Sequence, residues 1–177
     1  MTTWVALLRG VNVNGITIRS PALKELFRGL GYDDVRTVLA SGNVRFETDA
    51  DTAARERLKS RIEAALRERF GYDAWILLVT TDELATAIQG FPFEAEDAGR
   101  QPYVVFCRDH AVRDEIAEAA ASLDAAVDPA AAGPGVVYWS PPKGMSTDTP
   151  LARLLAKPRF KTSTTTRNLR TLIRIAG

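Results

Sequence analysis

The order of strand-like and helix-like segments is the feature that most limits the fold of this chain. Strands are expected at 4–8, 34–40, 44–48 and 74–80, and helices from 20 and from about 52 to 70. The first helix has Ser20 as its N-cap, Pro21 at the first helical position and Gly31 as its stop. The resulting order, β-α-β-β-α-β, predicts the split βαβ arrangement of ferredoxin-like folds.

The same order recurs in the second half of the chain. Thr80 and Glu83 form a capping box that predicts a short helix, and residues 90–102 form a connecting loop rich in glycine, proline and polar side chains. Strands are then expected at 103–108, 125–129 and 135–140, and helices at 114–123 and from Pro150. We therefore predict an α+β fold of two ferredoxin-like halves in tandem, residues 1–90 and 91–177, with mostly antiparallel sheets.

The composition indicates an ordinary globular protein. Apolar residues make up 46% of the 177 residues, charged residues 25%, and the net charge is +1. The single cysteine, Cys107, excludes an internal disulfide and lies in an apolar strand pattern, so we expect a buried, inert thiol. The N-terminal segment lacks the basic start of a signal peptide, and no window has the length of a membrane span. We expect a cytoplasmic protein.

Three short motifs, "LLRGVNVNG" at 7–15, "SGNV" at 41–44 and "TTTRN" at 164–168, occur in an order and at distances that resemble the bacterial family catalogued as domain of unknown function 1697. The resemblance spans nearly the whole chain. It implies a cytosolic α+β protein of two similar halves and brings no established activity.

The first of these motifs has two interpretations. Asn14-Gly15 is typical of a type I′ hairpin turn, because valine and isoleucine alternate with polar residues on both sides of it. Gly42-Asn43 is likewise a candidate two-residue turn. A turn alone requires neither Arg9 nor Asn12, so a binding site is the second interpretation.

The topology favours such a site. In a split βαβ unit the end of the first strand and the turn between the second and third strands lie at the same edge of the sheet. Arg9 and Asn12 should therefore meet Ser41 and Asn43. A guanidinium, carboxamides, a hydroxyl and backbone amides supply mainly donors, which suit a phosphate or carboxylate oxygen.

The sequence shows no recognisable catalytic or metal-binding motif. His110, the only histidine, follows Asp109 at an expected helix start, where a surface or capping role is typical. The acidic pairs fall in turns and before helices, and there is no P-loop and no GxGxxG pattern. We expect no cofactor and no metal.

The C-terminal block is the one strong charge asymmetry. All acidic residues precede residue 149, whereas residues 149–177 carry seven lysines and arginines. A terminal helix is expected to place Arg167, Arg170 and Arg174 on one face. Its apolar face would hold Leu169, Leu172, Ile173 and Ala176. The basic face is either a solvated surface, an anion site at a helix start, or an electrostatic footprint for RNA.

Three classes of function therefore stay open. The first is a binding module for a small phosphorylated or carboxylated ligand, held by Arg9, Asn12, Ser41 and Asn43 with Arg167 and Asn168 as a third contribution. The second is RNA binding without sequence preference through Arg170 and Arg174, although Phe160 is the only aromatic residue of the block. The third is an enzyme of unknown reaction. No membrane partner is expected, and the sequence does not indicate the oligomeric state.

Overall fold

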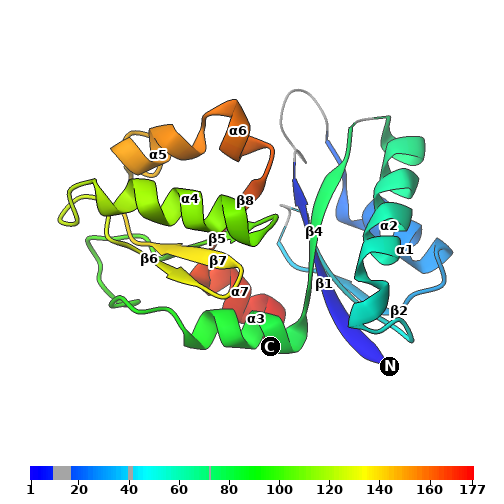
Figure 1. Ribbon diagram of the computed structural model, residues 1–177. Helices are drawn as coiled ribbons and strands as arrows, with labels where there is room; N and C mark the ends of the chain where they lie inside the picture. The colour runs from blue at the N-terminus through cyan, green and yellow to red at the C-terminus, as the bar shows by residue number, and fades with distance from the viewer. Residues whose placement is uncertain (10–16, 40–41, 72) are drawn as a thin grey trace. The chain divides into compact units, whose positions relative to one another are not determined.

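The computed structural model describes residues 1–9, 17–39, 42–71 and 73–177. The chain divides by its internal contacts into two compact units (Figure 1). The first comprises residues 1–84 with 174–177, and the second comprises residues 85–173. The division into halves at residue 90 stays a prediction.

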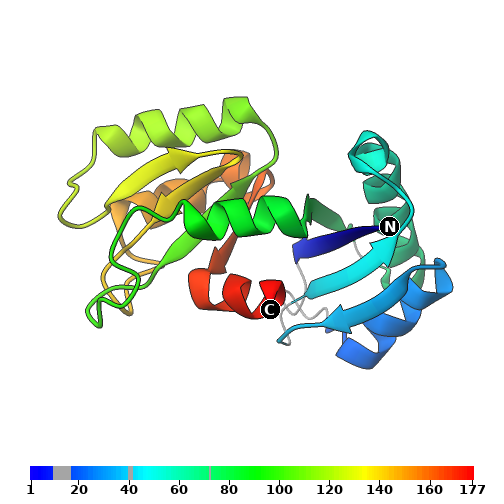
Figure 2. The ribbon, with the colours of Figure 1, turned by 90° about the horizontal axis from the view of Figure 1, so that it is seen from below.

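The first unit is built on a four-stranded sheet in the order β2-β3-β1-β4. The strands are β1 (Thr2–Arg9), β2 (Asp33–Thr37), β3 (Asn43–Thr48) and β4 (Trp75–Thr80). All neighbouring strands are antiparallel, so β1 and β2 run parallel with β3 between them. Figure 2 shows β1, β3 and β2 side by side. The assignment of this sheet to the ferredoxin-like split βαβ arrangement stays a prediction.

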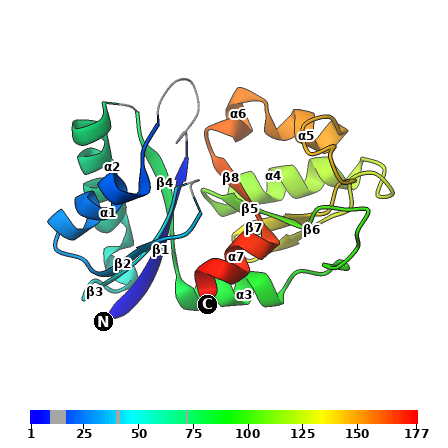
Figure 3. The same ribbon diagram turned by 180° about the vertical axis from the view of Figure 1, so that it is seen from behind.

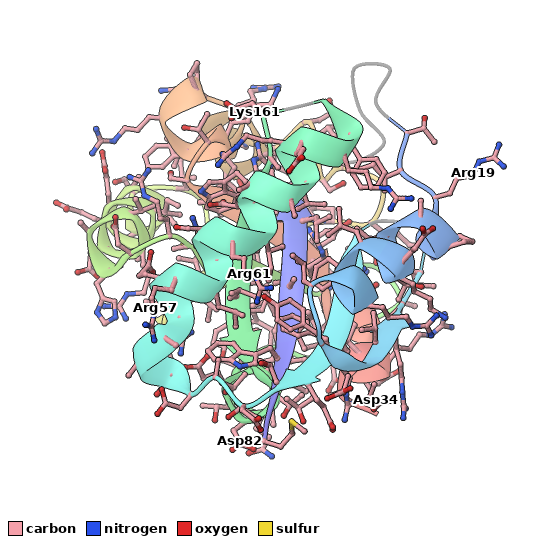
Figure 4. All side chains as sticks on the ribbon, turned by 90° about the vertical axis from the view of Figure 1, so that its right-hand side faces the viewer. Arg19, Asp34, Arg57, Arg61, Asp82 and Lys161 are labelled. Carbon is pink, nitrogen blue, oxygen red and sulfur yellow. The ribbon has the colours of Figure 1, made fainter. Side chains whose placement is uncertain are left out.

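Two helices cover one face of this sheet. They are α1 (Ser20–Gly29) and α2 (Arg55–Phe70), the latter preceded by a short 3-10 turn (Thr52–Ala54), and Figure 4 views this helical layer with Arg57 and Arg61 on α2. Gly71 ends α2 in the left-handed conformation, with φ of 67°. The buried core contains Leu23, Leu26 and Phe27 from α1, Leu58, Ile62 and Leu66 from α2, and Trp4, Ala6 and Leu8 from β1.

The second unit repeats this order. Its strands are β5 (Tyr103–Cys107), β6 (Ala130–Gly133), β7 (Val136–Trp139) and β8 (Thr164–Asn168), arranged β6-β7-β5-β8 with antiparallel neighbours. The helices that pack on one face are α4 (His110–Ala121), α5 (Pro150–Leu155) and α6 (Pro158–Lys161) (Figures 1 and 3). The predicted α+β fold with two antiparallel sheets is thereby confirmed.

Two further helices connect or end the sheets. The helix α3 (Thr81–Gln89) starts at the predicted capping box, in which the Thr80 amide donates to Glu83 at 2.9 Å and the Glu83 amide donates to the Thr80 hydroxyl at 3.2 Å. The last helix is α7 (Leu169–Ala176). Among the described residues, none of these helices is long and apolar enough to cross a membrane.

The predicted strand at 125–129 is wrong. The strand β6 begins at Ala130, directly after that segment. Asp128 is buried instead, and its carboxylate accepts hydrogen bonds from the Trp139 indole at 2.9 Å and from the Leu151 amide at 3.1 Å. A buried carboxylate must be satisfied by such donors, and this requirement overrides the apolar pattern of the segment.

The predicted two-residue turn at Gly42-Asn43 is also wrong. Val38 and Asn43 close the ladder, with the Val38 amide donating to the Asn43 carbonyl at 3.0 Å. Asn43 is therefore the first residue of β3, and Leu39 and Gly42 flank the connection with φ of 57° and 77°. The other candidate turn, Asn14-Gly15, lies outside the described residues.

The buried face of the terminal helix differs from the apolar face expected from the sequence. Leu169, Leu172 and Ile175 are buried, whereas Ile173 is 51% exposed. The buried positions follow a spacing of three residues, and β8 extends to Asn168, so Arg167 lies on a strand and not on the helix. The strand sets where the helix begins, which local periodicity alone does not reveal.

Candidate functional site

Arg9 is the last residue of β1 and lies on the face of the sheet opposite α1 and α2. Successive side chains of a strand alternate between faces, and Leu8 belongs to the core beneath the helices. Val5, Leu7 and Arg9 therefore share the other face. Arg9 is half-buried, and this burial lowers the pKa of its guanidinium below the ordinary value. Among the described residues, no carboxylate forms a salt bridge with Arg9.

The end of β1 meets the connection between β2 and β3, as the topology predicts. Leu7 pairs with Asn43 in the antiparallel register, and the Leu8 amide donates to the Gly42 carbonyl at 2.8 Å. The backbone segments that carry the first two motifs therefore lie at one edge of the sheet. Asn12 and Ser41 lie outside the described residues, and their part in a site stays a prediction.

The Asn43 side chain has a structural role at this edge. It is fully buried, and its amide nitrogen donates to the Val38 carbonyl at 3.0 Å. This bond holds the two ends of the β2–β3 connection together. Asn43 therefore stabilises the backbone at this end of the sheet. A direct contact between Asn43 and a ligand stays a prediction.

Trp75 is a neighbour of Arg9 that sequence reasoning missed. Arg9 and Trp75 are directly opposed in the β1–β4 register, so their Cβ atoms project from the same face of the sheet. Trp75 is half-buried, and the Lys59 ammonium lies 5.9 Å from its ring centroid. The sequence shows a tryptophan at the start of the fourth strand. Its position opposite Arg9 follows only from the antiparallel register.

Arg167 and Asn168 lie on β8 of the second unit, where both form local bonds. The Arg167 guanidinium donates to the Thr165 hydroxyl at 2.7 Å and to the Thr166 carbonyl at 3.1 Å. The Asn168 side-chain oxygen accepts the Arg170 amide at 2.9 Å, which caps the start of α7. A contribution of Arg167 and Asn168 to the Arg9 site stays a prediction.

Arg170 and Arg174 are both exposed on α7, four residues apart and thus on one side of the helix. Phe160, the one aromatic side chain of the basic block, is buried in the core of the second unit with an exposed fraction of 4%. The block therefore has exposed cations, but Phe160 is not available to stack on a base.

Cys107 is buried and His110 is exposed at the start of a helix. Burial raises the pKa of the Cys107 thiol to about 12, so the thiol stays protonated and unreactive. His110 is exposed at the start of α4, where Asp109 accepts the Val112 amide at 2.9 Å as the N-cap. Within the described part of the chain, no three histidine, cysteine or acidic side chains gather as a metal site would require.

The two sheets and the edge at Arg9 define a duplicated α+β protein with a candidate anion site. Residues 1–138 match the family described as "Protein of unknown function (DUF1697)", and the chain belongs to this family. A solved structure, described as that of a conserved bacterial protein from Streptococcus pneumoniae, is similar over 99% of this chain and 97% of that one, with a TM-score of 0.81 and 20% sequence identity. This likeness shows the fold alone. None of the curated proteins matches the chain.

Proposed function

We propose that this protein binds a small phosphorylated or carboxylated compound at the edge of the first sheet, with Arg9 as the principal contact. The observation that carries the proposal is a half-buried guanidinium for which no described carboxylate serves as a counter-ion. Burying a charge is costly unless an opposite charge pairs with it, so we infer that a bound anion supplies the charge opposite to Arg9.

The chemistry of arginine narrows the ligand class. A guanidinium presents a planar fork of donors and pairs with carboxylate or phosphate oxygens through two parallel hydrogen bonds. Its position at a strand end, beside the connection that starts at Val38, is typical of binding residues that a rigid sheet presents at its edge. Asn12, Ser41, Arg167 and Asn168 are proposed additional contacts.

Nucleic-acid binding through the basic C-terminal block is a second candidate. It is supported by the exposure of Arg170 and Arg174 and by the absence of any acidic residue from 149 to 177. The burial of Phe160 argues against recognition by base stacking in this block. The expected binding is therefore weak, without sequence preference and strongly dependent on salt.

Thermal unfolding in the presence of small anions tests the principal proposal. Inorganic phosphate, pyrophosphate and citrate are the probes, and a ligand at 100 times its Kd stabilises the native state by about 2.7 kcal/mol. We expect at least one probe to raise the Tm of the wild-type protein and to have no effect on Arg9→Gln.

The matched control is Arg19→Gln, which removes an exposed arginine of the same unit. It should keep the full rise in Tm. If Arg9→Gln keeps the rise as well, or if no probe stabilises the wild-type protein, the proposal is wrong. Titration with an RNA oligonucleotide at low salt tests the second candidate, and Arg170→Gln with Arg174→Gln should weaken that binding and reduce its salt dependence.

A further inference from the structure

Trp75 differs from the other tryptophans of the chain. Trp4 and Trp139 are buried to 0% and 3% exposure. Their indole nitrogens donate to the Ala50 carbonyl at 3.0 Å and to the Asp128 carboxylate at 2.9 Å. Trp75 is half-buried and is not a member of the core beneath α1 and α2. An aromatic side chain is thus left partly exposed at the start of β4, at the strand position that opposes Arg9.

The register brings the Cβ atoms of Arg9 and Trp75 close together. Residues directly opposed in an antiparallel pair have Cβ atoms about 4.5–5.5 Å apart and project from the same face. Arg9 and Trp75 form such a pair, and Lys59 places a second cation near the indole. Lys59 is held there by Glu63, whose carboxylate accepts its ammonium at 3.1 Å.

We infer that the ligand of this edge is a nucleoside phosphate, whose base stacks on Trp75 while its phosphate pairs with Arg9. The inference rests on the proposed function and specifies that the anionic ligand also carries a nucleobase. Base stacking on an aromatic side chain and pairing of phosphate with arginine are the two interactions by which proteins hold nucleotides without reading their sequence. A nucleotide unit within a single strand offers the same chemistry as a free mononucleotide.

Fluorescence titration of the intact protein tests the inference. Adenosine monophosphate, adenosine, inorganic phosphate and a short oligoadenylate are the probes. Stacking on the one half-exposed tryptophan should quench its emission, and adenosine monophosphate should bind more tightly than phosphate or adenosine. Isothermal titration calorimetry, which does not depend on the emission of Trp75, should show that Trp75→Leu weakens the binding of adenosine monophosphate about 5- to 150-fold, the loss that corresponds to one stacked base.

Trp75→Phe is the matched control, because it retains an aromatic ring and should retain most of the affinity. Arg9→Gln keeps the indole and should lose the binding of adenosine monophosphate, which keeps the test interpretable if Trp75→Leu does not fold. Tighter binding of oligoadenylate per nucleotide supports a strand as the source of the ligand, whereas equal binding supports a free nucleotide.

The two proposals fail in different ways. If phosphate stabilises the protein through Arg9 but adenosine monophosphate binds no more tightly and leaves the emission unchanged, the nucleotide inference is overturned and the anion site remains. If neither phosphate nor adenosine monophosphate binds, both are overturned.

Discussion

Arg55 and Glu83 form an ion pair in the first unit, with a guanidinium nitrogen of Arg55 at 2.9 Å from a carboxylate oxygen of Glu83. The same carboxylate accepts the Thr80 amide at the start of α3. Burial alone would raise the pKa of the Glu83 carboxyl, but the bonds from Arg55 and Thr80 outweigh burial and lower it. The Glu83 side chain therefore caps the start of α3 and forms an ion pair with Arg55 of α2.

The lowered pKa of Glu83 predicts how stability depends on pH. The contribution of Glu83 is fully present above the ordinary glutamate pKa of about 4.3 and is lost as the pH falls through the lower pKa of the folded state. The side chain is 43% exposed, so solvent screening limits the contribution to about 0.5–1 kcal/mol. We expect Glu83→Gln to lose that amount at pH 7, measured by urea unfolding, and the difference from the wild-type protein to shrink as the pH falls below the ordinary glutamate pKa.

The control for this prediction is Glu115→Gln, which removes the acid of the exposed pair between Arg159 and Glu115. Its effect on the free energy of unfolding at pH 7 should be smaller than that of Glu83→Gln, because Glu115 caps no helix. A difference between Glu83→Gln and the wild-type protein that grows on acidification would contradict the assignment.

Asp128 is expected to be a major stabilising residue of the second unit. Its replacement in Asp128→Ala leaves the buried donors of Trp139 and Leu151 without an acceptor, which should cost about 2–4 kcal/mol. Denaturant unfolding, with tryptophan emission as a second signal, measures the loss. Asp124→Ala removes a nearby exposed carboxylate that accepts only the Ala126 amide and should cost much less. Equal losses would show that Asp128 has no special role.

Gly90 and Tyr138 should be energetically coupled. A Cβ at Gly90 would lie 2.5 Å from the Tyr138 hydroxyl, which donates to the Ala87 carbonyl at 2.7 Å. Gly90→Ala should therefore cost about 1–3 kcal/mol. In the Tyr138→Phe background the same substitution should cost less, because the clashing oxygen is gone. A double-mutant cycle of unfolding free energies measures the coupling, and a value of zero would contradict the predicted clash.

Gly29→Ala is the control for that cycle. Nothing lies within 4 Å of a Cβ at Gly29, and the residue belongs to α1, so alanine should leave stability unchanged or raise it by up to about 1 kcal/mol. A comparable loss at Gly29 would show that the cost at Gly90 reflects backbone effects and not Tyr138.

The orientation of α7 can be tested with two adjacent residues. Leu172 is fully buried, and Leu172→Ala should cost about 2–5 kcal/mol. Ile173 is 51% exposed, and Ile173→Ala should change the free energy of unfolding by less than about 1 kcal/mol. Thermal or denaturant unfolding distinguishes the two. Equal losses would favour the helical face expected from the sequence, in which both residues are buried.

Local sequence patterns predict the order of the elements in the first unit and indicate the duplication of the fold, but they do not predict β8 (Thr164–Asn168). Apolar periodicity, the proline at the start of α1 and the capping box at Thr80 act within a few residues, so they can be interpreted locally. The expectation that the end of β1 meets the β2–β3 connection followed from the handedness of the crossover, and the pairing of Leu7 with Asn43 agrees with it.

The register of the strands and the roles of individual polar side chains depend on tertiary contacts. The pairing of Arg9 with Trp75, the position of Asn43 inside β3 and the hydrogen bonds that Asp128 accepts each depend on residues far away in the sequence. A shift of one residue in a strand exchanges its two faces without changing its local pattern. Contacts between distant segments therefore decide which polar groups are buried and satisfied and which remain at the edge of the sheet to bind a ligand.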